Sequence, residues 1–375
     1  MLECVPAMRP DLAYWVAFSL IPGVGRARFQ LLERHFGSLE EAWRAPASAL
    51  LAAGLDRRTV TAIVQRRERL SPQGEMERLS RLGVRALTWH DDAYPPLLRE
   101  IYELPPVLYV RGELEERDRV AVAVVGTRRP TPYGRQAAEE LSWALARAGV
   151  TIVSGLARGI DAIAHRSALE AGGRTIAVMA CGLDMVYPPE HARLARQVME
   201  RGALVSDYPL GTAPRADYFP RRNRIMAGLS LGVLVVEGDM TSGALNTARW
   251  AVEQDREVFA VPGSIFSPQS QGPHWLLQQG AKLVQRVEDV LEELNLTMVP
   301  QQATLAAPAP DGDTEAALLR HIGREPLHVD DLCRLSGLPI ATVSGTLAML
   351  ELKGLVKQVS AMTYVRAHAL TGGGR

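Results

Sequence analysis

The chain has 375 residues, of which 47% are hydrophobic and 22% charged, proportions typical of a globular protein with more than one domain. Basic and acidic residues number 42 each, so affinity for nucleic acid would have to come from a local basic patch. The sequence lacks an apolar run of membrane-spanning length, a signal-peptide layout, and cysteines at metal-ligand spacing. We therefore predict a cytoplasmic protein without membrane association, bound metal or disulfide framework.

Residues 1–83 are predicted to form a helical domain of the SAM or helix–hairpin–helix type. The turn Pro22-Gly23-Val24-Gly25 precedes an amphipathic helix, which is the arrangement of a helix–hairpin–helix motif. In that motif the glycine turn offers backbone N–H groups to a DNA phosphate and reads no base. A tight corner between two helices, without any ligand, fits the same residues equally well. Both interpretations are kept.

Residues 84–295 are predicted to form an extended Rossmann-like domain. Val84–Trp89 and Val107–Val110 are candidate strands beside double prolines, and we expect them to pack on an edge of the main sheet. From Val120 onward, short apolar strands alternate with helical segments, which predicts a doubly wound parallel sheet. The proposed strands are Val120–Val125, Val150–Val153, Thr175–Met179, Leu204–Ser206, Gly232–Val236, Glu257–Val261 and Lys282–Val284.

Glycine-containing turns follow several of these strands, at Gly126–Arg129, Ser154–Asp161, Cys181–Asp184 and Gly238–Ala244. In a parallel sheet these turns collect at the carboxyl edge, where ligands bind. Glycine allows a close backbone approach, and the following helix start attracts anions. The first turn is neither a dinucleotide fingerprint nor a Walker loop, which disfavours a nicotinamide enzyme and an NTPase. A site for one or a few phosphodiesters remains.

Three arginines, Arg221, Arg222 and Arg224, are predicted to open a later helix. They would oppose the positive end of its dipole, and a bound phosphate would offset that cost. The alternative is an ion-pair network with Asp161, Glu237 or Asp239, and a mixture of both roles is also open.

Ser242, Asn246 and Thr247 are candidate donors to phosphate or sugar oxygens, although simple helix capping fits each of them as well. Asp161 and His165 lie one helical turn apart. We expect an orienting hydrogen bond between them and not hydrolysis, because no nucleophile with an adjacent base is evident.

Residues 296–313 are predicted to be a linker, and residues 314–370 a winged-helix-like domain. Its expected elements are the helices Thr314–Ile322, Val329–Ser336 and Pro339–Leu352, followed by a hairpin over 354–365. The third helix contains neither arginine nor lysine, and Lys357 and Arg366 are the cations near the wing. Because DNA-reading helices use such residues, a protein-interaction role has at least equal support.

Several motifs together resemble the DNA-processing protein A family, called DprA or Smf, over nearly the whole chain. They are Val122–Arg128, Ile152–Asp161, Thr175–Asp184 with Tyr187-Pro188, Phe219–Ser230, Ser242–Ala248 and Val258–Gly263. The resemblance implies a non-enzymatic protein that binds single-stranded DNA, protects incoming strands and helps load a RecA-type recombinase during natural transformation. It also implies a homodimer formed through the Rossmann-like domain.

In the family a Gly-Ser/Thr-Arg turn forms the DNA pocket, and Gly126, Thr127 and Arg128 occupy it in this chain. Family members often carry lysines near the pocket. This chain has none there, so arginines would take their place. The expected nucleic-acid-binding residues are Gly126, Thr127, Arg128, Arg129, Ser154, Gly155, Arg158, Gly159, Arg221, Arg222, Asn223, Arg224, Ser242, Gly243, Asn246 and Thr247.

We expect no catalytic residue, no metal and no cofactor. The expected partners are single-stranded DNA, a RecA-type recombinase and a second copy of the chain, with single-strand-binding protein as a further candidate. The principal alternative is a Rossmann-type nucleotide-processing enzyme resembling a phosphoribohydrolase. That group uses a Pro-Gly-Gly-x-Gly-Thr-x-x-Glu run, whereas Thr241–Thr247 lacks the double glycine and the glutamate. A winged-helix transcription factor would need a basic recognition helix, which is missing.

Overall fold

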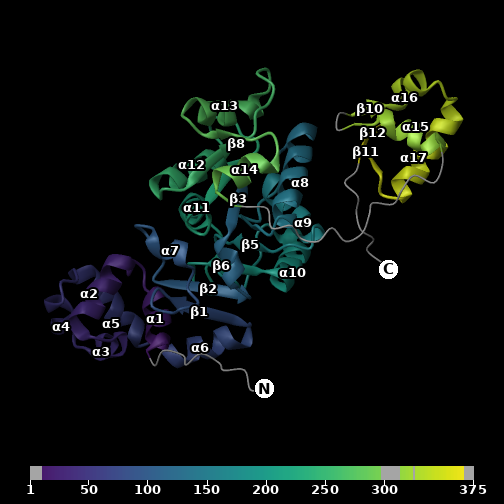
Figure 1. Cartoon of the computed structure of the whole chain (residues 1–375). Helices are drawn as coiled ribbons and strands as arrows, with labels where there is room; N and C mark the ends of the chain where they lie inside the picture. The colour runs from purple at the N-terminus through teal and green to yellow at the C-terminus, as the bar shows by residue number, and fades with distance from the viewer. Residues whose placement is uncertain (1–10, 297–312, 324–325, 367–375) are drawn as a thin grey trace. The chain divides into compact units, whose positions relative to one another are not determined.

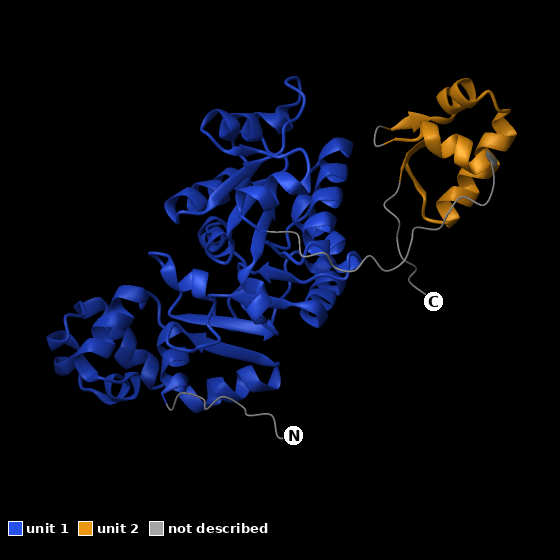
Figure 2. Ribbon diagram, in the orientation of Figure 1, with its two compact units in different colours: residues 1–298 blue, residues 299–375 orange. Residues whose placement is uncertain are grey.

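The computed structural model describes residues 11–296, 313–323 and 326–366. The chain divides into two compact units, residues 1–298 and 299–375 (Figure 2). Each unit has its own hydrophobic core and is described separately. Most of the residues of the predicted linker, 297–312, lie outside the described part of the chain.

Helices at the start of the first unit enclose a core rich in aromatic rings. Trp15 packs 5.2 Å from Phe29, and Phe18 packs 5.1 Å from Trp43, measured between ring centroids. The hydrophobic cluster continues to Tyr109 in the sheet, so these helices close one end of the sheet. The helices are α1 (Leu12–Ser19), α2 (Arg26–Phe36), α3 (Leu39–Arg44), α4 (Ala47–Ala52), α5 (Arg57–Arg67) and α6 (Pro72–Arg81).

The strands of this unit form one nine-stranded sheet in the order β1-β2-β6-β5-β4-β3-β7-β8-β9. The strands β3 to β9 run parallel, while β1 and β2 pair antiparallel on the β6 edge. The predicted doubly wound sheet with an edge extension is therefore confirmed. The bounds are β1 (Val84–Thr88), β2 (Val107–Gly112), β3 (Ala121–Val125), β4 (Thr151–Ser154), β5 (Thr175–Val178), β6 (Ala203–Ser206), β7 (Gly232–Val235), β8 (Glu257–Ala260) and β9 (Lys282–Leu283).

Helices cover both faces of the sheet, because neighbouring apolar residues of each central strand point to opposite faces. In β3, Val122 and Val124 pack with α8 (Pro132–Arg147) and α9 (Ile160–Glu170). Ala123 and Val125 pack with α11 (Tyr218–Gly228) and α12 (Gly243–Glu253) on the other face (Figure 1). The remaining helices are α7 (Pro96–Glu100), α10 (Ala192–Arg201), α13 (Gln271–Gln278) and α14 (Val287–Glu293), with short 3-10 turns at Glu116–Arg119, Pro189–His191 and Pro268–Ser270.

The direction of winding reverses at β3. The strands β4, β5 and β6 follow on one side of it, and β7, β8 and β9 lie on the other. In open α/β sheets the ligand crevice lies at the carboxyl ends of the strands where this reversal occurs. The topology therefore places the expected ligand site at the turns after β3 and β7.

The second unit is a winged helix built from α15 (Asp313–His321), α16 (Val329–Ser336) and α17 (Ile340–Leu352). A small sheet, β10 (Leu327–His328), β12 (Thr363–Arg366) and β11 (Val356–Ser360), forms the wing, and β10 was not predicted. No single helix among the described residues is long and apolar enough to cross a membrane. The bent pair α16 and α17 meets the length and composition criteria, with an angle of 111° between them.

Candidate nucleic-acid interface

The first turn, Gly126–Arg129, leaves β3 at the point of reversal and is held by Glu237 of the neighbouring β7 turn. The Thr127 N–H donates to the Glu237 carbonyl (2.7 Å), and the Glu237 carboxylate accepts from the N–H (2.9 Å) and hydroxyl (2.5 Å) of Thr131. A Cβ at Gly126 would lie 2.6 Å from Ile160, so this approach needs glycine. With the backbone fixed in this way, Arg128 and Arg129 project into solvent.

The second turn, between β4 and α9, mainly supports the first turn and contributes little to the cavity lining. The Ser154 hydroxyl is buried and donates to the Val124 carbonyl (2.7 Å). A Cβ at Gly159 would come within 2.8 Å of the Arg128 Cα, so this glycine lets the two turns pack together. Arg158 is exposed and pairs with Glu190 (Nε to Oε1, 2.6 Å). Of the predicted residues in this turn, Ser154, Gly155, Arg158 and Gly159 do not line the cavity.

The arginines of α11 separate into different environments. Arg222 is 4% exposed and donates to the carbonyls of Gly155 (2.9 Å) and Val178, beneath the first two turns. Arg224 faces away and pairs with Asp207 (2.7 Å), and more distantly with Glu103 (3.8 Å). Arg221 is exposed but does not line the cavity. Of the three, Arg222 lines the cavity and the other two do not, because α11 starts at Tyr218 and spreads them around its circumference.

The ion-pair alternative holds in part, because Arg224 is paired with carboxylates and the charge of Asp161 acts on Arg222. Asp207 and Glu103 are the carboxylates that pair with Arg224, not the residues proposed from sequence. Asp161 accepts N–H bonds from Gly155 (3.2 Å) and Ala157 (3.4 Å) instead. Burial raises the pKa of Asp161 and lowers that of Arg222, and each charge opposes the shift of the other. Because a guanidinium keeps its proton in proteins, Arg222 remains a cation under the pocket.

The third turn leads into α12 and mostly satisfies its own polar groups. The Ser242 hydroxyl accepts from the Ala244 N–H (3.3 Å), as a helix cap does. Asp239 accepts from the N–H (2.8 Å) and hydroxyl (2.7 Å) of Thr241. Asn223 joins α11 to α12 by donating to Asn246 Oδ1 (3.2 Å). This turn therefore forms part of the cavity wall and presents a few polar atoms, while the arginines supply the positive charge.

These turns enclose an open cavity of about 820 Å³ at the carboxyl edge of the sheet. Four arginines (Arg128, Arg129, Arg215 and Arg222) and two aspartates (Asp161 and Asp239) line it, an excess of positive charge. The structure brings ten of the predicted residues together here: Gly126, Thr127, Arg128, Arg129, Arg222, Asn223, Ser242, Gly243, Asn246 and Thr247. Phosphate-sized anions fit such a lining.

Sequence reasoning missed the aromatic wall of this cavity. The Arg128 guanidinium lies 5.6 Å from the centre of the Phe219 ring, and Tyr187 lies 5.6 Å from the same ring. Both rings line the cavity, and Tyr187 is 40% exposed. The available signal was Phe219, which lies two residues before the first arginine of the run, Arg221. No group of three or more potential metal ligands occurs among the described residues.

Two family models match the chain. The model of "DNA recombination-mediator protein A" matches residues 85–295, and that of the "DprA winged helix domain" matches residues 301–362. Protein Smf from Synechocystis is 38% identical over 393 aligned positions, covering 95% of this chain and 99% of that protein. Protein Smf from Escherichia coli is 46% identical over 279 positions, covering 71% of this chain and 73% of that protein.

Two solved structures are similar as well. DNA processing protein A from Streptococcus pneumoniae is 36% identical with a TM-score of 0.64, covering 75% of this chain and 96% of that one. DNA processing protein A from Helicobacter pylori is 31% identical with a TM-score of 0.51, covering 56% of this chain and 95% of that one. The latter structure is described by its single-stranded DNA binding mode.

Proposed function

The chain belongs to the DNA recombination-mediator protein A family, and from that membership we propose that its β3–β7 cavity binds single-stranded DNA. The observation that carries the proposal is the pairing of Arg128 with Phe219 at the open edge of the cavity. Arg128 and Arg129 are positioned to hold phosphates, and the Phe219 ring can stack with an unpaired base. The relative from Helicobacter pylori supports the choice of a single strand.

This geometry favours a single strand over a duplex. Bases in a duplex are stacked on one another and cannot reach a ring set among phosphate-binding groups, whereas splayed bases can. The contacts available are a cation, backbone N–H groups and an aromatic face, none of which distinguishes one base from another. Binding should therefore depend on salt concentration more than on base sequence.

Titration of a labelled oligothymidine at several salt concentrations, beside a duplex of equal length, tests the proposal. Arg128→Ala should weaken single-strand binding about tenfold, and the slope of log affinity against log salt should fall by about 0.7. Arg158→Ala is the matched control, because Arg158 is also exposed near this edge but is paired with Glu190. Unchanged affinity and slope for folded Arg128→Ala would place the DNA elsewhere.

We further propose that the protein has no turnover activity on nucleotides. The Asp161 and Asp239 carboxylates that line the cavity accept nearby N–H bonds, which suits structural roles and not activation of a water. Mass spectrometry of nucleoside monophosphates incubated with the protein should find no free base or phosphate. Base release that Arg128→Ala abolishes would instead support the phosphoribohydrolase alternative.

Within the family's mediator role, we propose that the bound strand is protected and passed to a RecA-type recombinase by a homodimer, with single-strand-binding protein as a further partner. Holding a strand by its phosphates and a few bases leaves the other bases open to a second protein. Sedimentation at micromolar concentration should show a dimer, and recombinase assembly on coated single strands should speed up when the protein is added. A monomer under these conditions would remove the dimer from the proposal.

A further inference from the structure

An exposed tyrosine lies outside the cavity, beside the helices α1 and α2 and the glycine turn between them, which we call the helical hairpin. Tyr102 follows α7 and is 86% exposed. The guanidinium of Arg26, the first residue of α2, lies 5.5 Å from the centre of this ring. Arg26 has no carboxylate in ion-pair distance among the residues described in the structure. An exposed ring that a free cation covers is a common element of single-strand binding sites.

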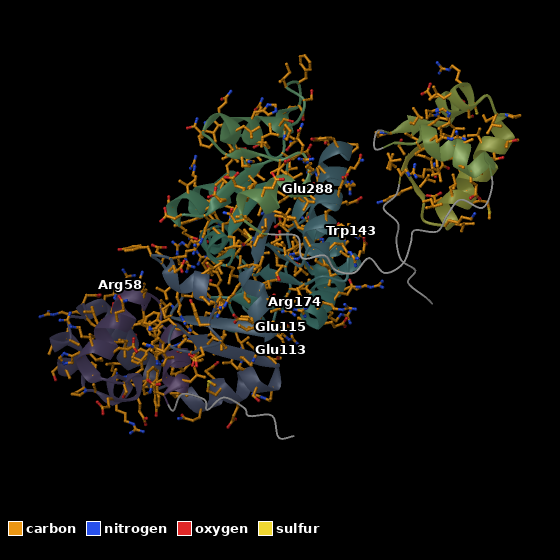
Figure 3. All side chains as sticks on the ribbon, in the orientation of Figure 1. Arg58, Glu113, Glu115, Trp143, Arg174 and Glu288 are labelled. Atoms are coloured by element: carbon orange, nitrogen blue, oxygen red, sulfur yellow. The ribbon has the colours of Figure 1, made fainter. Side chains whose placement is uncertain are left out.

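More arginines lie at the same margin of the helical hairpin. Arg28 pairs with Asp56 (2.8 Å), which brings the beginning of α5 next to the beginning of α2. The next two residues, Arg57 and Arg58, are exposed, and Figure 3 labels Arg58. The side chains of this margin therefore carry more positive than negative charge. The backbone of the glycine turn is not included in that balance.

A series of contacts joins this margin to the cavity. Arg215 lines the cavity and lies 5.1 Å from the centre of the Tyr218 ring. Tyr218 stacks on Tyr208, with 4.4 Å between centroids and 22° between planes. The neighbour of Tyr208, Asp207, pairs with Arg224, and Arg224 reaches Glu103, which follows Tyr102 in the chain. The rings of Tyr218, Tyr208 and Tyr102 form what we call the aromatic track.

Charge is distributed unevenly along the aromatic track. In its middle, Arg224 faces two carboxylates, Asp207 at 2.7 Å and Glu103 at 3.8 Å, so this part of the track carries one more negative than positive charge. Arg221 near the cavity and Arg26 at the far end have no ion pair among the described residues. With its free cations at the two ends, the aromatic track suits a strand whose phosphates are held at both ends and whose bases lie on the rings.

We propose that a single strand leaving the cavity follows the aromatic track to Tyr102 and Arg26, so that the helical hairpin supplies a second DNA contact. This inference rests on the proposed function, since it needs a strand in the cavity. It predicts that binding depends on length. A short oligonucleotide fills the cavity alone, while a longer one also reaches Tyr102.

The test compares an oligothymidine of about 6 nucleotides, near the lower end of the site sizes of single-strand binding folds, with one of about 20 nucleotides, beyond their upper end. Tyr102→Ala and Arg26→Ala should each weaken binding of the long strand about five- to tenfold and leave the short strand within about twofold. Unlike Tyr102→Ala, Tyr102→Trp should bind the long strand as well as the native chain does, because it retains a stacking surface. Arg26→Ala should also lower the salt slope by about 0.7 for the long strand only.

Arg147→Ala is the matched control, because Arg147 also covers an aromatic ring, that of Trp143, at 5.7 Å. That pair lies on α8, which packs on the opposite face of the sheet from α11, and Figure 3 labels Trp143. Arg128→Ala separates the two proposals, since it should weaken both lengths. If Arg128→Ala weakens binding of both lengths while Tyr102→Ala changes neither, the proposed aromatic track is wrong. The proposed binding of DNA in the cavity then still holds. Equal losses of both lengths for Tyr102→Ala, or loss of recombinase assembly with unchanged long-strand binding, would also overturn the inference.

Discussion

His165 lies in α9, one helical turn after Asp161, and its side chain is completely buried. The Thr175 hydroxyl donates to the Ile152 carbonyl (2.8 Å), so it must accept the Nδ1–H of His165 (2.6 Å). This arrangement fixes the tautomer and leaves Nε2 without a hydrogen-bond partner among the described residues. The expected bond between Asp161 and His165 is therefore wrong. Burial lowers the pKa of His165 to about 3, so the folded protein holds this ring neutral.

This neutral ring should make stability depend on pH. In the unfolded chain His165 binds a proton below about 6.5, while the folded chain binds none until about 3. The free energy of unfolding should therefore fall on acidification, by about 1.4 kcal/mol per pH unit from this residue. Urea unfolding at roughly pH 7 and pH 5 should show a drop about 2 kcal/mol larger for wild type than for His165→Gln. Equal drops would show that His165 titrates normally in the folded state.

The sequence could predict that the turns after β3 and β7 form the cavity, because glycine and apolar strands mark them locally, but the turn Cys181–Asp184, predicted with them, does not line it. It could not predict which arginine stays free. Arg128 and Arg158 occupy comparable turns, yet Glu190 from a later segment pairs with Arg158 alone. Arg224 likewise meets Asp207, whose position depends on how β6 ends. Such partners are set by packing between distant elements, which local patterns do not encode.

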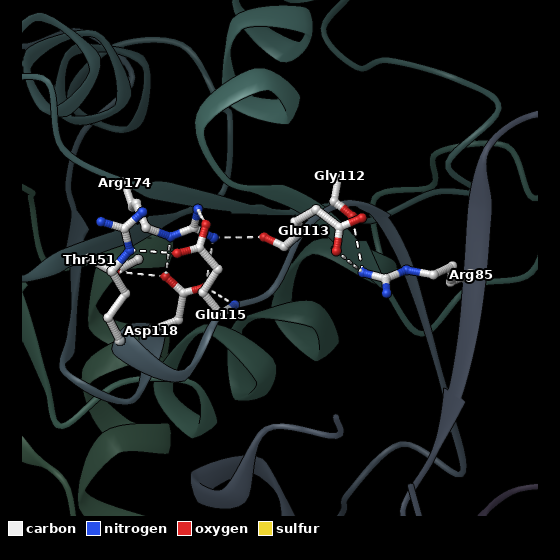
Figure 4. Close-up of polar contacts among 8 residues, drawn as sticks. Arg85, Gly112, Glu113, Glu115, Asp118, Thr151 and Arg174 are labelled. Atoms are coloured by element: carbon white, nitrogen blue, oxygen red, sulfur yellow. Dashed lines mark hydrogen bonds and ion pairs between the residues drawn. The ribbon is translucent and has the colours of Figure 1, made fainter. Parts of the chain in front are cut away.

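At the scale of elements, a buried ion-pair cluster fastens the edge extension of the sheet to its centre. Arg174, 8% exposed before β5, makes two bonds of 2.8 Å to the Asp118 carboxylate (Figure 4). It also reaches Glu115 (2.5 Å) and the Glu113 carbonyl (2.7 Å). These acceptors lie between β2 and β3, so one guanidinium fixes the connection between the antiparallel and parallel parts of the sheet.

Arg174→Met should lower the free energy of unfolding by about 3 kcal/mol, because it leaves Asp118 buried without its cation. The matched control is Arg117→Ala, which removes an exposed pair with the same Glu115 and should cost less than about 1 kcal/mol. Chemical denaturation measures both. Single-strand affinity should not change in either variant, since neither arginine lines the cavity. A loss below about 1 kcal/mol for Arg174→Met would mean that the cluster is not needed for stability.

The strands of the first unit followed from the sequence, with ends displaced by one or two residues, whereas α7, which begins at the second proline of Pro95-Pro96, was not predicted. The apolar runs made the parallel strands recognisable, and the double prolines limited the edge strands. The sharing of one core between the helical segment and the sheet was not foreseen. It depends on Tyr109 and Leu204 facing Trp15 and its neighbours across the fold, which is a tertiary relation.

For the whole molecule, the question is what the second unit adds. Its helix α17 contains no cation, and Ile340, Met349 and Leu352 on it are 53%, 50% and 83% exposed. Lys353, which directly follows α17, is paired with Glu315 (2.8 Å). Phosphates find little attraction on such a surface, whereas an apolar partner surface would bury these side chains favourably. This composition favours a protein contact.

Removing residues 297–375 should therefore leave single-strand affinity within about threefold of the full chain, because the cavity and the aromatic track both lie in the first unit. The same truncation should reduce the part of recombinase loading that depends on α17. Leu352→Ser in the full chain should have the same effect, because it removes an apolar side chain that is 83% exposed. Titration with an oligothymidine and a recombinase-assembly assay separate the two effects. A loss of more than about tenfold in affinity, roughly 1.4 kcal/mol, would make the winged helix a principal DNA site. In that case its wing residues, and not α17, would be the place to look for the phosphate contacts, since Lys357 and Arg366 are the wing's basic side chains.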